Sequence, residues 1–183
     1  MEILKNIIMV IVSPRMGWDD VNRSCIPTGR LLSSTFLPLL VVLAITSFVP
    51  MIYDPSLTFL HSLMAAILKF FGYFVTFHLT AYVLASLFPH IAKSQGAVDR
   101  LNDYIIYNLI YLILLEIVEN LIPVEFAPIF FMMFYMPYIA YKGTEFLGIE
   151  KELQMRFAIV ASVLMLATPL AFLWLLNSLS VSN

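Results

Sequence analysis

Long apolar runs constrain this chain more than any other feature, because each is about the length needed to cross a lipid bilayer. A membrane-spanning helix takes roughly 20 predominantly apolar residues. The chain is 61% hydrophobic and only 12% charged, whereas a soluble domain is about 45–50% apolar and about 25% charged. We therefore expect an all-α polytopic membrane protein, a bundle of five transmembrane helices over residues 31–53, 57–88, 103–122, 126–141 and 156–176.

Residues 1–30 form a separate region in which polar side chains surround one short apolar stretch. The pattern over Ile3–Val12 predicts an amphipathic helix lying in the plane of the membrane interface. Ser13 and Pro14 end this helix, and Ser13 is expected to cap a second short helix with Pro14 at its first position. We expect Trp18 to lie at the depth of the lipid headgroups. Ser13, Pro14 and Trp18 are therefore candidate interfacial residues.

The basic residues are distributed very unevenly along the chain. All of the ten Lys and Arg residues except Lys69 lie before the first run, between the second and third, or between the fourth and fifth. Cytoplasmic loops of membrane proteins carry the excess of Lys and Arg. We therefore expect a cytoplasmic N-terminal region 1–30, a membrane domain 31–176 and a tail 177–183 outside, and the compact form favours a bacterial inner membrane. These basic residues are Lys5, Arg15, Arg23, Arg30, Lys93, Arg100, Lys142, Lys151 and Arg156.

Several polar side chains fall inside the apolar runs. A carboxylate that faces lipid near the middle of the bilayer costs about 2.5–3.5 kcal/mol, so such groups are expected to point into the bundle. Lys69 lies at a similar depth to Glu116, and we expect the two to form an ion pair. With about 100° of rotation per residue, one face of the run 103–122 carries Asn108, Glu116, Glu119 and Asn120.

Different roles remain open for this candidate intramembrane cluster of Lys69, Asn108, Glu116, Glu119 and Asn120. In the first, the ion pair only holds two helices together. In the second, Glu116 and Glu119 form part of a path for protons or cations. A third arrangement, in which the helices are rotated so that the groups never meet, is also compatible with the sequence.

Motifs that carry enzyme chemistry are missing from the sequence. It contains no HExxH, no GxSxG and no phosphate-binding glycine loop. The three His residues lack the spacing of metal ligands, and the single Cys25 leaves no thiol pair. A net charge of −2 gives no general attraction to nucleic acid. We therefore expect a protein that is not an enzyme and has no metal, cofactor or nucleic-acid partner.

Three segments of the chain carry a resemblance to a known family. They are IIMVIVSPRMGWDDV, VLASLFPHIAKSQGAVDRLNDYIIYNLI and YMPYIAYKGTEFLGIEKELQMRFAIV. The first is similar to the interfacial helix, Ser-Pro, basic residue and Trp that open compact bacterial members of the Yip family, named for Ypt/Rab-interacting proteins. The second is similar to the family's second and third spans with their polar loop, and the third to its fourth span and the Glu/Lys loop before span five.

Ser13, Pro14 and Trp18 are the closest matches to the Yip family. The chain departs from the family pattern at Asn108 and Leu109, where a Tyr-Ser and a proline often occur, and it lacks the long cytosolic tail and DLYGP-type signature of eukaryotic members. The resemblance implies a five-span membrane protein. In eukaryotic relatives it implies binding of Rab GTPases, which is not transferred to any residue here. Looser matches to the family are Gly96, Tyr141 and Gly143.

The leading functional hypothesis is a non-enzymatic membrane protein that binds partners or organises the bilayer. Its expected partners are membrane lipids, a protein on the cytoplasmic face, or further copies of itself in a homo-oligomer. The alternative is a small transporter or channel that uses Lys69, Glu116 and Glu119. A third hypothesis is an intramembrane enzyme that acts on lipid.

Overall fold

The computed structural model describes residues 2–92, 94–122 and 131–181. Within these residues the chain is all-helical and contains no strand, as the apolar runs predict. The elements in chain order are α1 Glu2–Val12, α2 Pro14–Ser24, α3 Thr28–Leu31, the π-helical turn η1 Leu32–Phe36, α4 Leu37–Thr46, the 3-10 turn η2 Val49–Ile52, α5 Phe59–Leu87, the 3-10 turn η3 Pro89–Ala92, α6 Gln95–Leu121, α8 Met136–Phe146 and α9 Lys151–Val181.

In the described part of the chain, four helical segments are long and apolar enough to cross a membrane. They account for the predicted runs 31–53, 57–88, 103–122 and 156–176, and their composition is that of a membrane protein. The four segments are Thr28–Ile52, Phe59–Leu87, Gln95–Leu121 and Lys151–Phe172.

Three of these segments begin earlier than the apolar pattern predicts. The first begins at Thr28 rather than at residue 31. α6 begins at Gln95, because the hydroxyl of Ser94 accepts a hydrogen bond from the backbone N–H of Ala97 at 3.3 Å and caps the helix. α9 begins at Lys151 rather than at residue 156. The added first turns are polar, so hydropathy alone did not include them in the spans.

The predicted fourth span, 126–141, is not among the four segments. Residues 126–130 lie outside the described residues. The described remainder is not one helix, because residues 131–133 are helical, residues 134–135 form a turn, and α8 follows. α8 has 11 residues and is about 16 Å long at 1.5 Å per residue, about half of a bilayer's hydrocarbon thickness. The count of five spans therefore stays a prediction.

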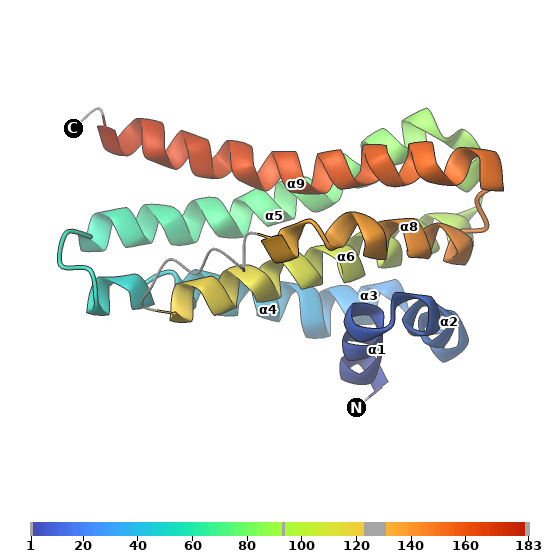
Figure 1. The fold of residues 1–183 in the computed structure, drawn as a ribbon, viewed down its shortest axis with the longest axis horizontal. Helices are drawn as coiled ribbons and strands as arrows, with labels where there is room; N and C mark the ends of the chain where they lie inside the picture. The colour runs from blue at the N-terminus through green and yellow to red at the C-terminus, as the bar shows by residue number, and fades with distance from the viewer. Residues whose placement is uncertain (1, 93, 123–130, 182–183) are drawn as a thin grey trace.

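The long helices lie side by side along one axis, as Figure 1 shows. α5 packs along α9, and α6 contacts α4, α5 and α8. α6 is the central helix. In its apolar stretch 78% of the residues are buried, against 28–39% in those of the other three candidate spans. α8 ends and α9 begins at the same end of the bundle, and α9 runs from there to the opposite end, where the C-terminus lies (Figure 1).

A tight turn connects η2 to α5. Ser56 donates two hydrogen bonds to Oδ1 of Asp54, one from its hydroxyl at 2.6 Å and one from its backbone N–H at 3.0 Å. These hydrogen bonds stabilise the ionised carboxylate and lower the pKa of Asp54. Thr58 then caps α5 by accepting a hydrogen bond from the backbone N–H of His61 at 3.2 Å. The turn brings α5 back against α4.

The first two helices form a compact hairpin beside the bundle. α1 and α2 are joined through Ser13 and pack closely on each other. A Cβ atom at Gly17 would lie 2.3 Å from the backbone nitrogen of Val10, so only glycine permits this close approach. Lys5 and Asp20 form an ion pair at 3.1 Å across the hairpin. In Figure 1 this hairpin lies outside the row of long helices, near the end at which α9 begins.

Candidate functional site

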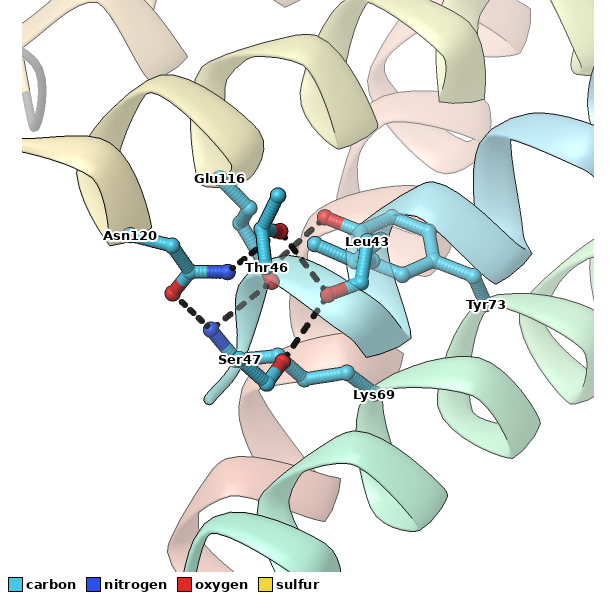
Figure 2. A network of polar contacts seen from close by, with 7 residues as sticks. All are labelled: Leu43, Thr46, Ser47, Lys69, Tyr73, Glu116 and Asn120. Atoms are coloured by element: carbon cyan, nitrogen blue, oxygen red, sulfur yellow. Dashed lines mark hydrogen bonds and ion pairs between the residues drawn. The ribbon is translucent and has the colours of Figure 1, made fainter. Parts of the chain in front are cut away.

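The polar cluster joins side chains of three helices in the apolar part of the bundle. We define it as Thr46 at the end of α4, Lys69 and Tyr73 of α5, and Glu116 and Asn120 of α6. Figure 2 shows these five side chains pointing toward one another. Polar residues are spaced along α5 and α6 so that they fall on the faces where these helices meet α4 and each other.

Both oxygens of the Glu116 carboxylate have a polar neighbour. The hydroxyl of Tyr73 donates a hydrogen bond to Oε1 at 2.8 Å. Nζ of Lys69 lies 3.5 Å from Oε2. The Lys69–Glu116 ion pair expected from the sequence is therefore present, and the third arrangement, in which these groups never meet, is wrong.

Asn120 extends the ion pair to a third helix. Lys69 Nζ donates a hydrogen bond to Oδ1 of Asn120 at 3.0 Å, and the amide of Asn120 donates one to Thr46 Oγ1 at 3.2 Å. The hydroxyls of Thr46 and Ser47 both donate to the backbone oxygen of Leu43, at 3.0 and 2.9 Å. A continuous chain of polar contacts thus connects α5 through α6 to α4 (Figure 2).

The polar cluster is closely packed. The side chains of Glu116 and Lys69 are 5% and 14% exposed. The hollow beside them has a volume of about 10 Å³, and a single water needs about 10–15 Å³. Gly72 helps to close it, since a Cβ atom there would lie 3.3 Å from the side chain of Phe172. The hollow is lined by Leu68, Lys69, Gly72, Tyr73, Glu116, Pro169 and Phe172.

Two of the five predicted cluster residues are placed differently from the other three. Asn108 donates a hydrogen bond to the backbone oxygen of Tyr104 within its own helix at 2.8 Å, about two turns before Glu116. Glu119 is exposed. At about 100° per residue, positions 119 and 120 lie on opposite sides of position 116. Asn120 therefore turns toward α4 and α5, whereas the exposed Glu119 lies beside the cluster, where its charge acts on Tyr73. Of the five predicted residues, Asn108 is the one that lies apart.

The predicted cluster did not include Thr46 or Tyr73, nor the contact that Tyr53 makes with it. Tyr73 belongs to a stripe of small and polar residues on α5, which was a usable signal. The hydroxyl of Tyr53 donates to the backbone oxygen of Asn120. No pattern pointed to this contact, because Tyr53 lies 67 positions away in the chain.

The aromatic anchor is a second site, which fastens α2 to the bundle. We define it as Trp18 with the residues around its ring, Tyr104, Tyr107, Phe146 and Gly143. Trp18 is only 2% exposed. Its ring stacks on Tyr104 and Phe146, with centroids 5.5 and 5.3 Å apart, and meets the edge of Tyr107 at 5.9 Å. A buried Trp therefore holds α2 against α6 and α8.

Two further features fix the ring of Trp18 in place. Its Nε1–H donates a hydrogen bond to the backbone oxygen of Ile139 at 3.1 Å, so the buried polar atom is satisfied. A Cβ atom at Gly143 would lie 2.8 Å from the Trp18 ring and 2.6 Å from the Tyr104 ring. Gly143 is therefore the residue that makes room for the anchor.

The structure gives the surroundings of Ser13, Pro14 and Trp18, the candidate interfacial residues. Trp18 is buried against protein and does not face lipid, and its depth in the membrane stays a prediction. Ser13 occupies the N-cap position of α2 with Pro14 at its first turn, as expected, but its side chain forms no capping hydrogen bond. Pro14 is buried. A single sequence does not tell whether an aromatic ring near an interface faces lipid or protein.

No protein-family model, curated protein or solved structure matches the chain. Among the described residues, no group of three or more His, Cys, Asp or Glu side chains is placed to hold a metal ion. Cys25 is exposed. What the two sites do is therefore argued from their own geometry.

Proposed function

We propose that the chain is a non-enzymatic integral membrane protein that binds partners or organises the bilayer. The observation that carries this proposal is the packing of the polar cluster. A transport path needs groups that water or an ion reaches in turn. Here the charged groups bind one another, and the hollow beside them has room for about one water.

The cluster suits a structural role in lipid. Lipid tails are as apolar as the helix surfaces, so association between spans relies on packing and interhelical hydrogen bonds. Lys69, Glu116 and Asn120 supply such contacts across three helices. We infer that they hold the bundle in one arrangement, which a surface for partner binding requires.

We further propose five membrane crossings, with the N-terminus in the cytoplasm of a bacterial cell and the chain in its inner membrane. The distribution of basic residues supports this topology. The opposite directions of α6 and α8 along the bundle axis also support it, since α8 ends where α9 begins (Figure 1). The C-terminus is then outside.

The proposed interfacial position of α1 is supported by its exposed side chains. Leu4, Ile8 and Val12 are 61%, 51% and 73% exposed and recur every fourth residue, so they form one apolar stripe. Ile7 and Val10 are buried on the opposite face. A helix with an apolar outer stripe beside a membrane domain is expected to insert this stripe between lipid headgroups.

We also propose that the chain is related to the Yip family. Trp18 and Gly143 are two of the positions on which that resemblance depends, and they lie in contact in the aromatic anchor. Because Trp18 and Gly143 contact each other, both positions contribute to the packing of the aromatic anchor. Rab binding is not part of this proposal.

Flux measurements on the purified protein in proteoliposomes test the proposal against a transporter. We expect wild type and Glu116→Gln to give the same proton and potassium flux as empty liposomes, because the cluster is closed. A flux through wild type that Glu116→Gln abolishes would instead establish the transporter. Size-exclusion chromatography of both proteins is the control for folding.

A further inference from the structure

Three basic side chains from three different helices line one hollow at the end of the bundle where α9 begins. Arg15 of α2, Arg100 of α6 and Lys142 of α8 line it, and its volume is about 190 Å³. We call it the basic hollow. Asp19 and Glu145 line it as well, so three positive and two negative groups leave a net charge of +1.

The three basic side chains of the basic hollow form no ion pair with the described residues. This holds although Asp19 and Glu145 are close by. The ammonium of Lys142 lies 5.6 and 5.5 Å from the ring centres of Tyr138 and Tyr141. These aromatic faces favour the position of the cation without neutralising it.

The aromatic anchor forms part of the wall of the basic hollow. Trp18 and Phe146 line the hollow, and their rings stack on each other. Arg100 also lines two neighbouring hollows, of about 100 and 340 Å³. A bound group can therefore extend past the guanidinium, so the site accepts a headgroup larger than a single small anion.

The surroundings of the basic hollow favour a lipid over a soluble anion. Met16, the neighbour of Arg15, is 59% exposed, and the apolar stripe of α1 is exposed on the same hairpin. α6 begins close to the hollow and passes from there into its apolar part. A headgroup bound here would leave its acyl chains beside apolar surface.

We propose that the basic hollow binds the headgroup phosphate of an anionic phospholipid. Guanidinium and ammonium groups form charge-assisted hydrogen bonds to phosphate oxygens, and basic pockets between membrane helices on the cytoplasmic side bind such headgroups. A phosphodiester carries one negative charge, which matches the net charge of the lining groups. This binding does not depend on whether the protein transports anything.

Binding is measured by native mass spectrometry of the intact protein in detergent, with phosphatidylglycerol, phosphatidylcholine or inorganic phosphate added. We expect wild type to retain phosphatidylglycerol only. Removal of each charge by Arg15→Gln, Arg100→Gln or Lys142→Gln should weaken retention about fivefold, and the triple variant about a hundredfold.

The matched control is the triple variant Arg23→Gln, Arg30→Gln, Lys151→Gln, which removes the same charge from exposed residues that do not line the hollow. It should retain phosphatidylglycerol as wild type does. Equal losses in the two triple variants, equal retention of phosphatidylcholine, or displacement of the lipid by inorganic phosphate would each overturn the proposal. If the triple variant of Arg15, Arg100 and Lys142 does not fold, the three single variants decide the result.

Discussion

Lys69 and Glu116 lie where a charge is expensive, and each is stabilised by the other and by a hydrogen bond. Tyr73 and Asn120 supply these hydrogen bonds. Removing one partner of a buried ion pair leaves the other charge uncompensated, which costs more than the intact pair contributes. The cluster is therefore most sensitive to changes that affect only one of the two charges.

Lys69→Met is expected to lower the free energy of unfolding by about 3–5 kcal/mol, because the buried Glu116 loses its counterion. Thermal unfolding in detergent measures the change. The double variant Lys69→Met, Glu116→Gln should recover most of the loss, since the Gln oxygen still accepts from Tyr73. An unchanged melting temperature in the single variant would show that the pair contributes nothing.

Gly143 is a second position at which a single substitution is expected to disturb the packing. Gly143→Ala should lower the free energy of unfolding by about 1–3 kcal/mol, because the new Cβ would push the Trp18 and Tyr104 rings apart. Thermal unfolding followed by tryptophan fluorescence measures this change. Gly29→Ala is the matched control, because a Cβ at Gly29 meets nothing within 4 Å, and its melting temperature should stay the same or rise.

Among the helices, those that could be predicted are the ones that composition alone defines. Hydropathy alone predicts α5, α6 and α9, because each lies in an apolar run long enough to cross a bilayer. Their ends were less certain, because the first turn of α6 depends on the cap at Ser94. The region 126–141 was the poorest prediction, because its described part contains a turn at residues 134–135 and Pro137 lies at the start of the next helix, not inside one continuous span.

The two sites were predictable only in part, because both depend on how the helices pack against one another. The cost of a charge in lipid implies that Lys69 and Glu116 find partners, and this inference holds without knowing the fold. The side of α6 on which Glu119 falls depends on how that helix is rotated against α4 and α5, which the sequence does not specify. The burial of Trp18 likewise depends on the space that Gly143 leaves on a distant helix.

The α1–α2 hairpin contacts α6 and α8, and the ring of Trp18 supplies its stacking contacts with them. Trp18→Ala should therefore detach the hairpin, because it removes the stacking contacts and the hydrogen bond to Ile139. Hydrogen exchange followed by mass spectrometry should be faster in α1 and α2 than in wild type, with α5 and α9 unchanged.

Trp174→Ala is the matched control for this variant, since Trp174 is 71% exposed. Its exchange in α1 and α2 should equal that of wild type. If Trp18→Ala left the exchange of the hairpin unchanged as well, other contacts of α1 and α2 would be sufficient to hold them.

Across the bundle, the polar cluster lies toward the end with the α4–α5 turn and the aromatic anchor toward the end where α9 begins. The two ends are therefore chemically different, with the proposed lipid site at the basic end. We expect this asymmetry to give the protein a single orientation in the membrane, which labelling of cysteine can determine.

Cys25 and an introduced Pro55→Cys are expected to face opposite sides of the membrane. Both positions are exposed, one in the N-terminal region and one in the α4–α5 turn. The Pro55→Cys variant is made in a Cys25→Ser background. A maleimide that does not cross the inner membrane should label it in cells whose outer membrane has been permeabilised. Native Cys25 should react only in inverted vesicles. Labelling of both from one side would contradict the N-in topology.

The position of Lys69 has a consequence for how the chain enters the membrane during synthesis. α5 emerges from the ribosome before α6, so the lysine reaches the translocon while its counterion is still untranslated. A lone lysine in a nascent span opposes its release into lipid. We expect α5 to wait at the lateral gate until Glu116 and Asn120 arrive, so that the two helices leave the channel as a pair.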